Sequence, residues 1–136
     1  IVTDFNHHYA VVGSWSSWKF QDMVRSTEDP SLWISNVRLG LSGEEEFQFV
    51  RDRDWCQVIH PGQHRVTDTQ VTVCGPDDRN HGKNWLVEGK RNDVVILQLR
   101  VRDGDIQVSV HTEALGVQTW QSIEDQDRAA VAIENG

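Results

Sequence analysis

Tryptophan is the residue type whose number and placement point most clearly to chemistry in this chain. The sequence holds six tryptophans among 136 residues. Trp18 follows a Ser-Ser pair and Trp55 follows an Asp-Arg-Asp run, and polar turn residues of this kind make burial harder to arrange. An exposed aromatic ring can stack on the apolar C–H face of a sugar, while polar neighbours bond the hydroxyls. We therefore predict that Trp18 and Trp55 form a binding platform.

The other four tryptophans are better explained as packing residues. Trp33 alternates with apolar residues on one face of a predicted strand, and Trp15 would anchor the turn that follows the first strand. Trp120 would close one end of the core. Trp85 lies beside two apolar residues, so a core position and a rim position are equally compatible with its surroundings.

The histidines are the residues most suggestive of catalysis or metal binding. His60 and His64 flank a Pro-Gly-Gln turn, and His81 follows two carboxylates in the loop 75–82. These spacings match no recognised ligand pattern, and we expect solvent-exposed turn residues. The chain also has no nucleophile elbow and no phosphate-binding glycine loop. The sequence therefore predicts a protein that is not an enzyme and that needs no metal or cofactor. An enzyme that uses the loop 77–81 with His60 is the weaker alternative.

Charge and composition exclude several classes of partner. The net charge of −8 disfavours nucleic acid and anionic membrane surfaces, which both require basic groups, and no apolar run is long enough to cross a membrane. Because the chain begins at Ile1, we expect a module of a longer protein. Cys56 and Cys74 favour two free thiols in a reducing compartment, which makes an intracellular location (cytoplasm or plastid) the expectation, although a disulfide between them stays open.

Short β-strands separated by turn signals account for most of the sequence, which predicts an all-β, antiparallel β-sandwich. We assign residues 1–123 to this sandwich and residues 124–136 to an acidic tail or short helix. The strands are predicted at 7–14, 32–39, 45–51, 56–59, 66–74, 84–88, 93–102, 105–111 and 119–123.

Two local features refine this arrangement. A glycine-bearing loop joins the strands 32–39 and 45–51, which predicts a hairpin, and Asp103-Gly104 is a second hairpin turn. In the first of these strands Trp33 and every second residue after it are expected to face the core. The segment 20–25 allows a short helical turn.

The order of these pieces resembles a known family. The motif G-S-W-S-S-W at 13–18, the strand 32–39, the run E-F-Q-F-V at 46–50, then Trp55 and Asn84, are similar to the starch- and glycogen-binding carbohydrate-binding modules. The likeness is greatest to the glycogen-binding domain of the AMP-activated kinase β-subunit, and it covers about residues 9–90. It implies an immunoglobulin-like β-sandwich.

The resemblance also implies roles for four residues. In the family the tryptophans that match Trp18 and Trp55 stack on α-glucan rings, and the asparagine that matches Asn84 bonds sugar hydroxyls. Gln48 falls where the family commonly has a lysine, so a polar contact from Gln48 is expected in an altered form.

The chain departs from the family at two further positions and in the length of one insertion. Asn80 and Gly82 fall near positions that supply an apolar and a hydroxyl contact in the glycogen-binding branch, so those contacts are predicted to be lost. The insertion before Asn84 is longer than the family minimum. The function implied is non-catalytic binding of α-glucan or malto-oligosaccharide, in a module that accompanies a protein partner or an attached catalytic domain. The alternative is a protein–protein interaction module on the same scaffold.

Overall fold

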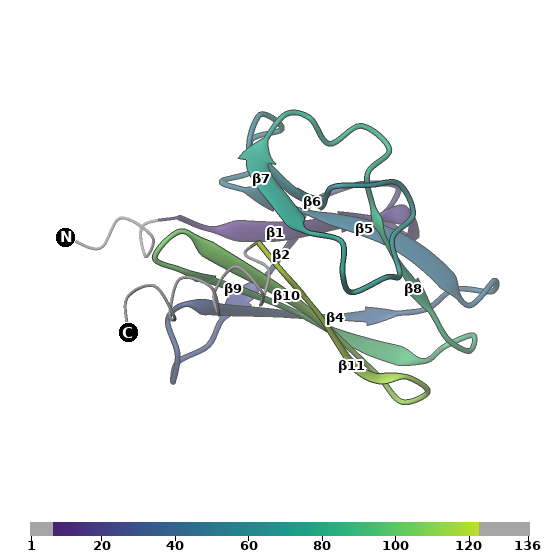
Figure 1. The fold of residues 1–136 in the computed structure, drawn as a ribbon. Coiled ribbons are helices and arrows are strands. Elements are labelled where there is room, and N and C mark those ends of the chain that lie inside the picture. Colours follow the sequence, from purple (N-terminus) through teal and green to yellow (C-terminus); the bar gives the residue numbers. More distant parts are fainter. Residues whose placement is uncertain (1–6, 123–136) are drawn as a thin grey trace, which may run out of the picture.

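The structure, a computed structural model, describes residues 7–122. In this part of the chain two antiparallel β-sheets pack face to face (Figure 1). One sheet has six strands and the other has five. The prediction of an all-β, immunoglobulin-like antiparallel sandwich is confirmed. The predicted acidic tail, 124–136, lies outside the described residues.

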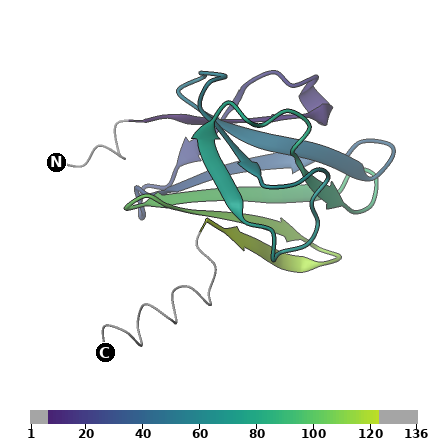
Figure 2. The same cartoon turned by 45° about the horizontal axis from the view of Figure 1, so that its top comes forward.

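The six-stranded sheet has the order β2-β1-β5-β6-β7, with β8 also paired to β5, and the five-stranded sheet has the order β11-β10-β9-β4-β3. Figure 2 shows these two layers from a second side. The first sheet contains β1 (Tyr9–Gly13), β2 (Gln21–Asp22), β5 (Glu44–Arg51), β6 (Val58–Pro61), β7 (Val73–Asp77) and β8 (Trp85–Glu88). The second contains β3 (Val24–Arg25), β4 (Leu32–Arg38), β9 (Val94–Arg102), β10 (Asp105–Thr112) and β11 (Gly116–Gln121).

Helical structure within residues 7–122 is limited to one 3-10 turn, η2 (Ser14–Ser16). No helix in this part of the chain is long and apolar enough to cross a membrane. The strands therefore supply most of the core of the described region.

The core follows the alternation expected from the sequence. Trp33, Ser35, Val37 and Leu39 are all buried, as predicted for one face of β4 and the residue after it. Side chains from β1 and from β5 to β11, together with Met23 and Val66, complete the main cluster between the sheets. The core thus takes every second residue of each long strand, because successive side chains of a strand point to opposite faces.

The predicted hairpin between the strands 32–39 and 45–51 is wrong. The first of them, β4, pairs with β3 and β9, whereas the second, β5, pairs with β1, β6 and β8. The turn at 40–43 therefore carries the chain from one sheet to the other, and Gly43 adopts a φ of 73° there. This crossing lets the apolar faces of both strands meet in the core, whereas a hairpin would place both strands in one layer.

The segment 20–25 forms two short strands in place of the helical turn that its sequence allows. In β2, Asp22 pairs with Ala10, and in β3, Val24 pairs with Ile34 of the opposite sheet. Met23, between them, is 5% exposed. Burial of this one side chain at the place where the chain changes sheets favours extended backbone on both sides of it.

Three tryptophans occupy the core. Trp33, Trp85 and Trp120 are at most 5% exposed, and Trp15 is half-buried against the same cluster. Trp85, which the sequence leaves undecided, is fully buried. Its ring lies 5.6 Å from that of Phe47, so the predicted strand at 84–88 has its aromatic side chain facing inward.

Candidate carbohydrate-binding surface

A shallow depression of about 340 Å³ brings together the four residues that the sequence singles out. They come from four separate parts of the chain: the turn after β1, the middle of β5, the loop before β6 and the residue that precedes β8. The full lining consists of Trp18, Gln48, Trp55, Asn80, His81, Gly82 and Asn84.

The floor under Trp18 is a small apolar cluster on the outer face of the six-stranded sheet. Val12, Val50 and Val58 form it, separate from the main core, and Trp18 and Phe20 pack against it. Trp18 is therefore half-buried, which corrects the prediction of an open ring. The three valines face outward in their strands, and water would contact them if the ring did not cover them.

Trp55 is the exposed ring of this surface, as predicted, with 45% of its area accessible. Its ring centroid lies 5.3 Å from that of Phe20, with 34° between the planes. The guanidinium of Arg53 lies 5.7 Å from the Phe20 ring and pairs with the Asp22 carboxylate at 2.8 Å. Phe20, which sequence analysis missed, thus supports Trp55. The signal that could have found it is its position two residues after Trp18 in a polar segment.

Gln48 is buried, at 3% exposure, and its amide holds a loop in place. Its Nε2 donates to the carbonyl oxygens of Asn80 and Lys83 at 2.8 and 2.9 Å, and its Oε1 accepts from Asn80 Nδ2 at 3.1 Å. Both amide protons are therefore already donated. Gln48 could therefore bond a ligand only through its oxygen, and its role as a hydrogen-bond partner stays a prediction.

The position of Gln48 explains why it contacts the loop. Phe47 of β5 pairs with Trp85 of β8, and Phe49 pairs with Ile59 of β6. Gln48 lies where β5 exchanges one neighbouring strand for the other. The loop between β7 and β8 passes this point, and the Gln48 amide bonds two of its carbonyl groups.

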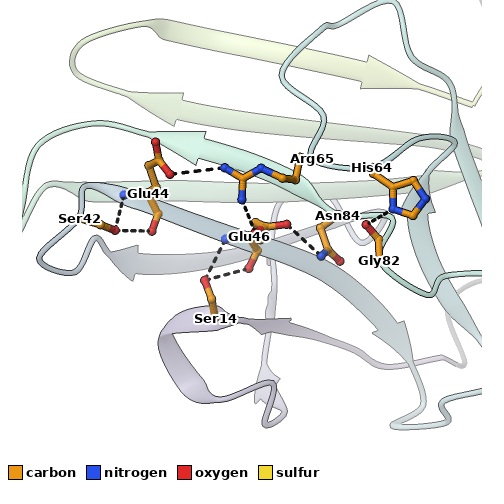
Figure 3. Close-up of polar contacts among 8 residues, drawn as sticks. All are labelled: Ser14, Ser42, Glu44, Glu46, His64, Arg65, Gly82 and Asn84. Atoms are coloured by element: carbon orange, nitrogen blue, oxygen red, sulfur yellow. Dashed lines mark hydrogen bonds and ion pairs between the residues drawn. The ribbon is translucent and has the colours of Figure 1, made fainter.

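Asn84 is held by a carboxylate. Its side-chain Nδ2 donates to Glu46 Oε1 at 3.2 Å. Its main-chain carbonyl oxygen accepts from Val66 N at 2.9 Å. Glu46 in turn accepts from Arg65 at 2.8 Å, as Figure 3 shows. Asn84 is 9% exposed, so it presents only a small part of its surface to the depression.

Two residues for which the sequence predicts lost contacts also line the depression. Asn80 presents its side chain to Gln48, and Gly82 adopts a φ of 71° with its carbonyl oxygen 2.8 Å from His64 Nδ1. His81, between them, is exposed and was not assigned to the site from sequence. The positive φ of Gly82 favours glycine. It lets the loop turn back toward the sheet at this residue.

The start of the same loop is anchored by a buried histidine. His60 is 2% exposed, so the prediction of a solvent-exposed turn residue is wrong for it. Its Nε2 lies 2.7 Å from Asp77 Oδ1 and its Nδ1 lies 2.8 Å from the carbonyl oxygen of Pro61. Arg79 N also donates to Asp77 Oδ1 at 2.9 Å. The ring therefore links β6 to the end of β7, where the loop begins.

We expect folding stability to depend on the ionisation of Asp77. Burial raises the pKa of this carboxyl, but hydrogen bonds from Arg79 and His60 and their charges lower it, and the net pKa lies below its usual value. Stability from a depressed carboxyl pKa is fully present above the unfolded value of about 3.9 and is lost as the pH falls through the folded value. Urea unfolding between pH 3 and 7 should therefore show a steeper loss below about pH 4 in the parent than in Asp77→Asn. Asp103→Asn, in an exposed turn, controls for the lost charge, and equal profiles for all three proteins would contradict the prediction.

The described residues contain no group of three or more His, Cys, Asp or Glu side chains placed to hold a metal ion. Cys56 and Cys74 are free thiols, which is the arrangement that the sequence favours. The groups that line the depression are aromatic faces, amide groups and one exposed imidazole.

Comparison with known proteins finds no matching family model, no similar curated protein and no similar solved structure. The resemblance to the starch- and glycogen-binding modules stays a prediction that rests on the residues quoted for it.

Proposed function

We propose that this chain is a non-catalytic module that binds α-glucan, such as a starch- or glycogen-like polysaccharide, through the depression on the six-stranded sheet. The observation that carries the proposal is the convergence of Trp18 and Trp55 on one shallow surface together with two asparagine side chains. Aromatic rings beside a few polar groups match the amphipathic character of a sugar ring.

Each part of the surface has a distinct proposed role. The exposed face of Trp55 stacks on a sugar ring, and the half-buried Trp18 supports a neighbouring ring of the same chain. Asn84 forms hydrogen bonds with sugar hydroxyls. Gln48, which also lines the depression, holds the loop that carries Asn80 and its neighbours. Because the depression is shallow, an extended polymer can lie across it without an end having to enter, which suits a module that attaches a larger protein or a catalytic domain to a polysaccharide.

The test is a titration with a linear malto-oligosaccharide, followed by tryptophan fluorescence and calorimetry. We expect saturable binding and a change in tryptophan emission, because the exposed face of Trp55 would leave water on stacking. A β-linked gluco-oligosaccharide of equal length is the control and should not bind. Absence of binding at millimolar α-linked ligand would refute the proposal.

A protein–protein interaction module is the second candidate, and one observation favours it. Apolar side chains are exposed on the five-stranded sheet, where Val117 pairs with His111 and His111 pairs with Ile96. Exposed apolar groups gathered on one face are a feature of interaction surfaces. If the titration shows no binding, the informative experiment is a pull-down assay from a lysate of the source organism. It compares the parent with a variant in which Val117 and Ile96 are replaced by lysine. The exposed apolar residues of this face and its adjoining turn are Val24, Val94, Ile96, Leu115 and Val117.

A further inference from the structure

The segment His64–Val66 lies directly beside the residues that lead into β8. His64 Nδ1 lies 2.8 Å from Gly82 O, and Val66 N donates to Asn84 O at 2.9 Å. Leu86 N donates to the carbonyl oxygen of Val66, also at 2.9 Å. This segment belongs to the stretch between Trp55 and Asn84, which is longer than the minimum of the glucan-binding family that the sequence resembles. The backbone around Asn84 is therefore held by hydrogen bonds from a segment about 20 residues earlier in the chain.

Side chains continue the same support. Arg65 Nη1 donates to Glu46 Oε2 at 2.8 Å, and Glu46 Oε1 accepts from Asn84 Nδ2 at 3.2 Å. A second carboxylate, Glu44, lies 3.5 Å from Arg65 Nη2. Figure 3 shows the chain Arg65–Glu46–Asn84, with Glu46 between the other two. Neither Glu46 nor Arg65 lines the depression, whereas Asn84 does.

The chemistry of a carboxylate fixes the direction of the amide. An ionised carboxylate only accepts hydrogen bonds, whereas an amide has a donating and an accepting end. Glu46 can therefore bond only the Nδ2 end of Asn84, so the Oδ1 end must point away from Glu46. The Arg65 guanidinium bonds the other carboxylate oxygen, which keeps Glu46 in this position.

We propose that Glu46 and Arg65 are positioning residues that orient the Asn84 amide, so that its Oδ1 accepts a hydrogen bond from a hydroxyl of the bound ligand. The proposal rests on the proposed function of the depression as a glucan-binding surface. It adds to that function a fixed role for Asn84, which becomes a hydrogen-bond acceptor rather than a group that can rotate to donate or accept. The cost of ordering the amide is then met before the ligand binds.

Arg65→Met and Glu46→Gln test this arrangement. Arg65→Met removes the charge and keeps an unbranched chain, and Glu46→Gln keeps the shape but makes the bond to Asn84 possible with either end of the amide. We expect each to weaken malto-oligosaccharide binding roughly three- to tenfold, the scale of one oriented hydrogen bond. In an Asn84→Ala background neither change should weaken binding further, because the group that they orient is gone. An equal loss in both backgrounds would overturn the proposal.

A second readout does not depend on binding. The side-chain amide of Asn84 gives a pair of proton–nitrogen NMR signals in the ligand-free protein, and we expect these signals to move in Arg65→Met and Glu46→Gln. Arg102→Met is the matched control, because Arg102 is similarly exposed and pairs with Asp29 away from the depression. Unchanged Asn84 signals in both variants would refute the positioning role. If the parent protein binds no glucan, the proposed function fails on its own, while the signals still report on the orientation of Asn84.

Discussion

Trp55→Ala is expected to weaken malto-oligosaccharide binding by about 1–3 kcal/mol, roughly five- to 150-fold in Kd. Trp55 offers the largest exposed aromatic surface in the depression, with 45% of its area accessible. Its ring packs against that of Phe20, with 5.3 Å between the two centroids. A ring that is already fixed in the free protein loses little conformational freedom on binding, so most of its contact energy contributes to affinity.

The fold should survive this substitution, because nearly half of the Trp55 side chain is already in contact with water. We expect the circular dichroism spectrum of Trp55→Ala to match that of the parent. Val117→Ala is the matched control, since Val117 is an exposed apolar residue on the opposite sheet. A folded Trp55→Ala protein that binds as tightly as the parent would remove the assignment of this surface.

Trp85→Ala is expected to have the largest effect on stability, with a loss of about 3–5 kcal/mol in the free energy of unfolding. Trp85 is fully buried and lies at the centre of an aromatic cluster. Its ring centroid is 5.6 Å from those of Phe47 and Phe49 and 6.4 Å from that of Trp120. Truncation would leave a cavity between the two sheets that these rigid rings cannot fill.

Urea unfolding measures this loss, with Leu41→Ala as the control because Leu41 is 78% exposed. Within the described residues, Trp85 Nε1 is buried without a hydrogen-bond partner. Trp85→Phe, which removes this unpaired group and keeps an aromatic ring, should therefore lose distinctly less stability than Trp85→Ala. A loss below about 1 kcal/mol for Trp85→Ala would contradict the central place of this ring in the core.

The local sequence was sufficient to predict the longer strands, but it allowed a helical turn in place of β2 and β3, and it predicted a strand at 66–74 where the structure has β7 at Val73–Asp77. In β4 the alternation that starts at Trp33 predicts which side chains enter the core, because a strand has a fixed period of two. The Asp103-Gly104 turn was predictable for a similar reason, since both residues adopt the positive φ that this dipeptide favours. Trp55 was recognisable as an exposed ring because polar residues precede it.

Features that depend on the partner strand were not predictable in the same way. The two strands on either side of Gly43 look like a hairpin, but they lie in opposite sheets. Alternation fixes which face of a strand is apolar and leaves open which strand lies beside it. His60 likewise follows a strand and precedes Pro-Gly, which suggests an exposed turn, and only the pairing of β6 with β7 buries it beside Asp77.

The candidate site shows the same difference between features that the local sequence predicts and features that depend on tertiary contacts. The sequence alone identifies Trp18, Trp55, Asn84 and Gln48 as candidates, in their order along the chain. The cover that Trp18 forms over outward-facing valines and the bonds from Gln48 to a loop emerge only in the folded chain, because side-chain burial and hydrogen bonding depend on segments distant in the sequence. The same holds for Glu46 and Arg65, since a contact between β5 and an insertion leaves no trace in the local pattern of either segment.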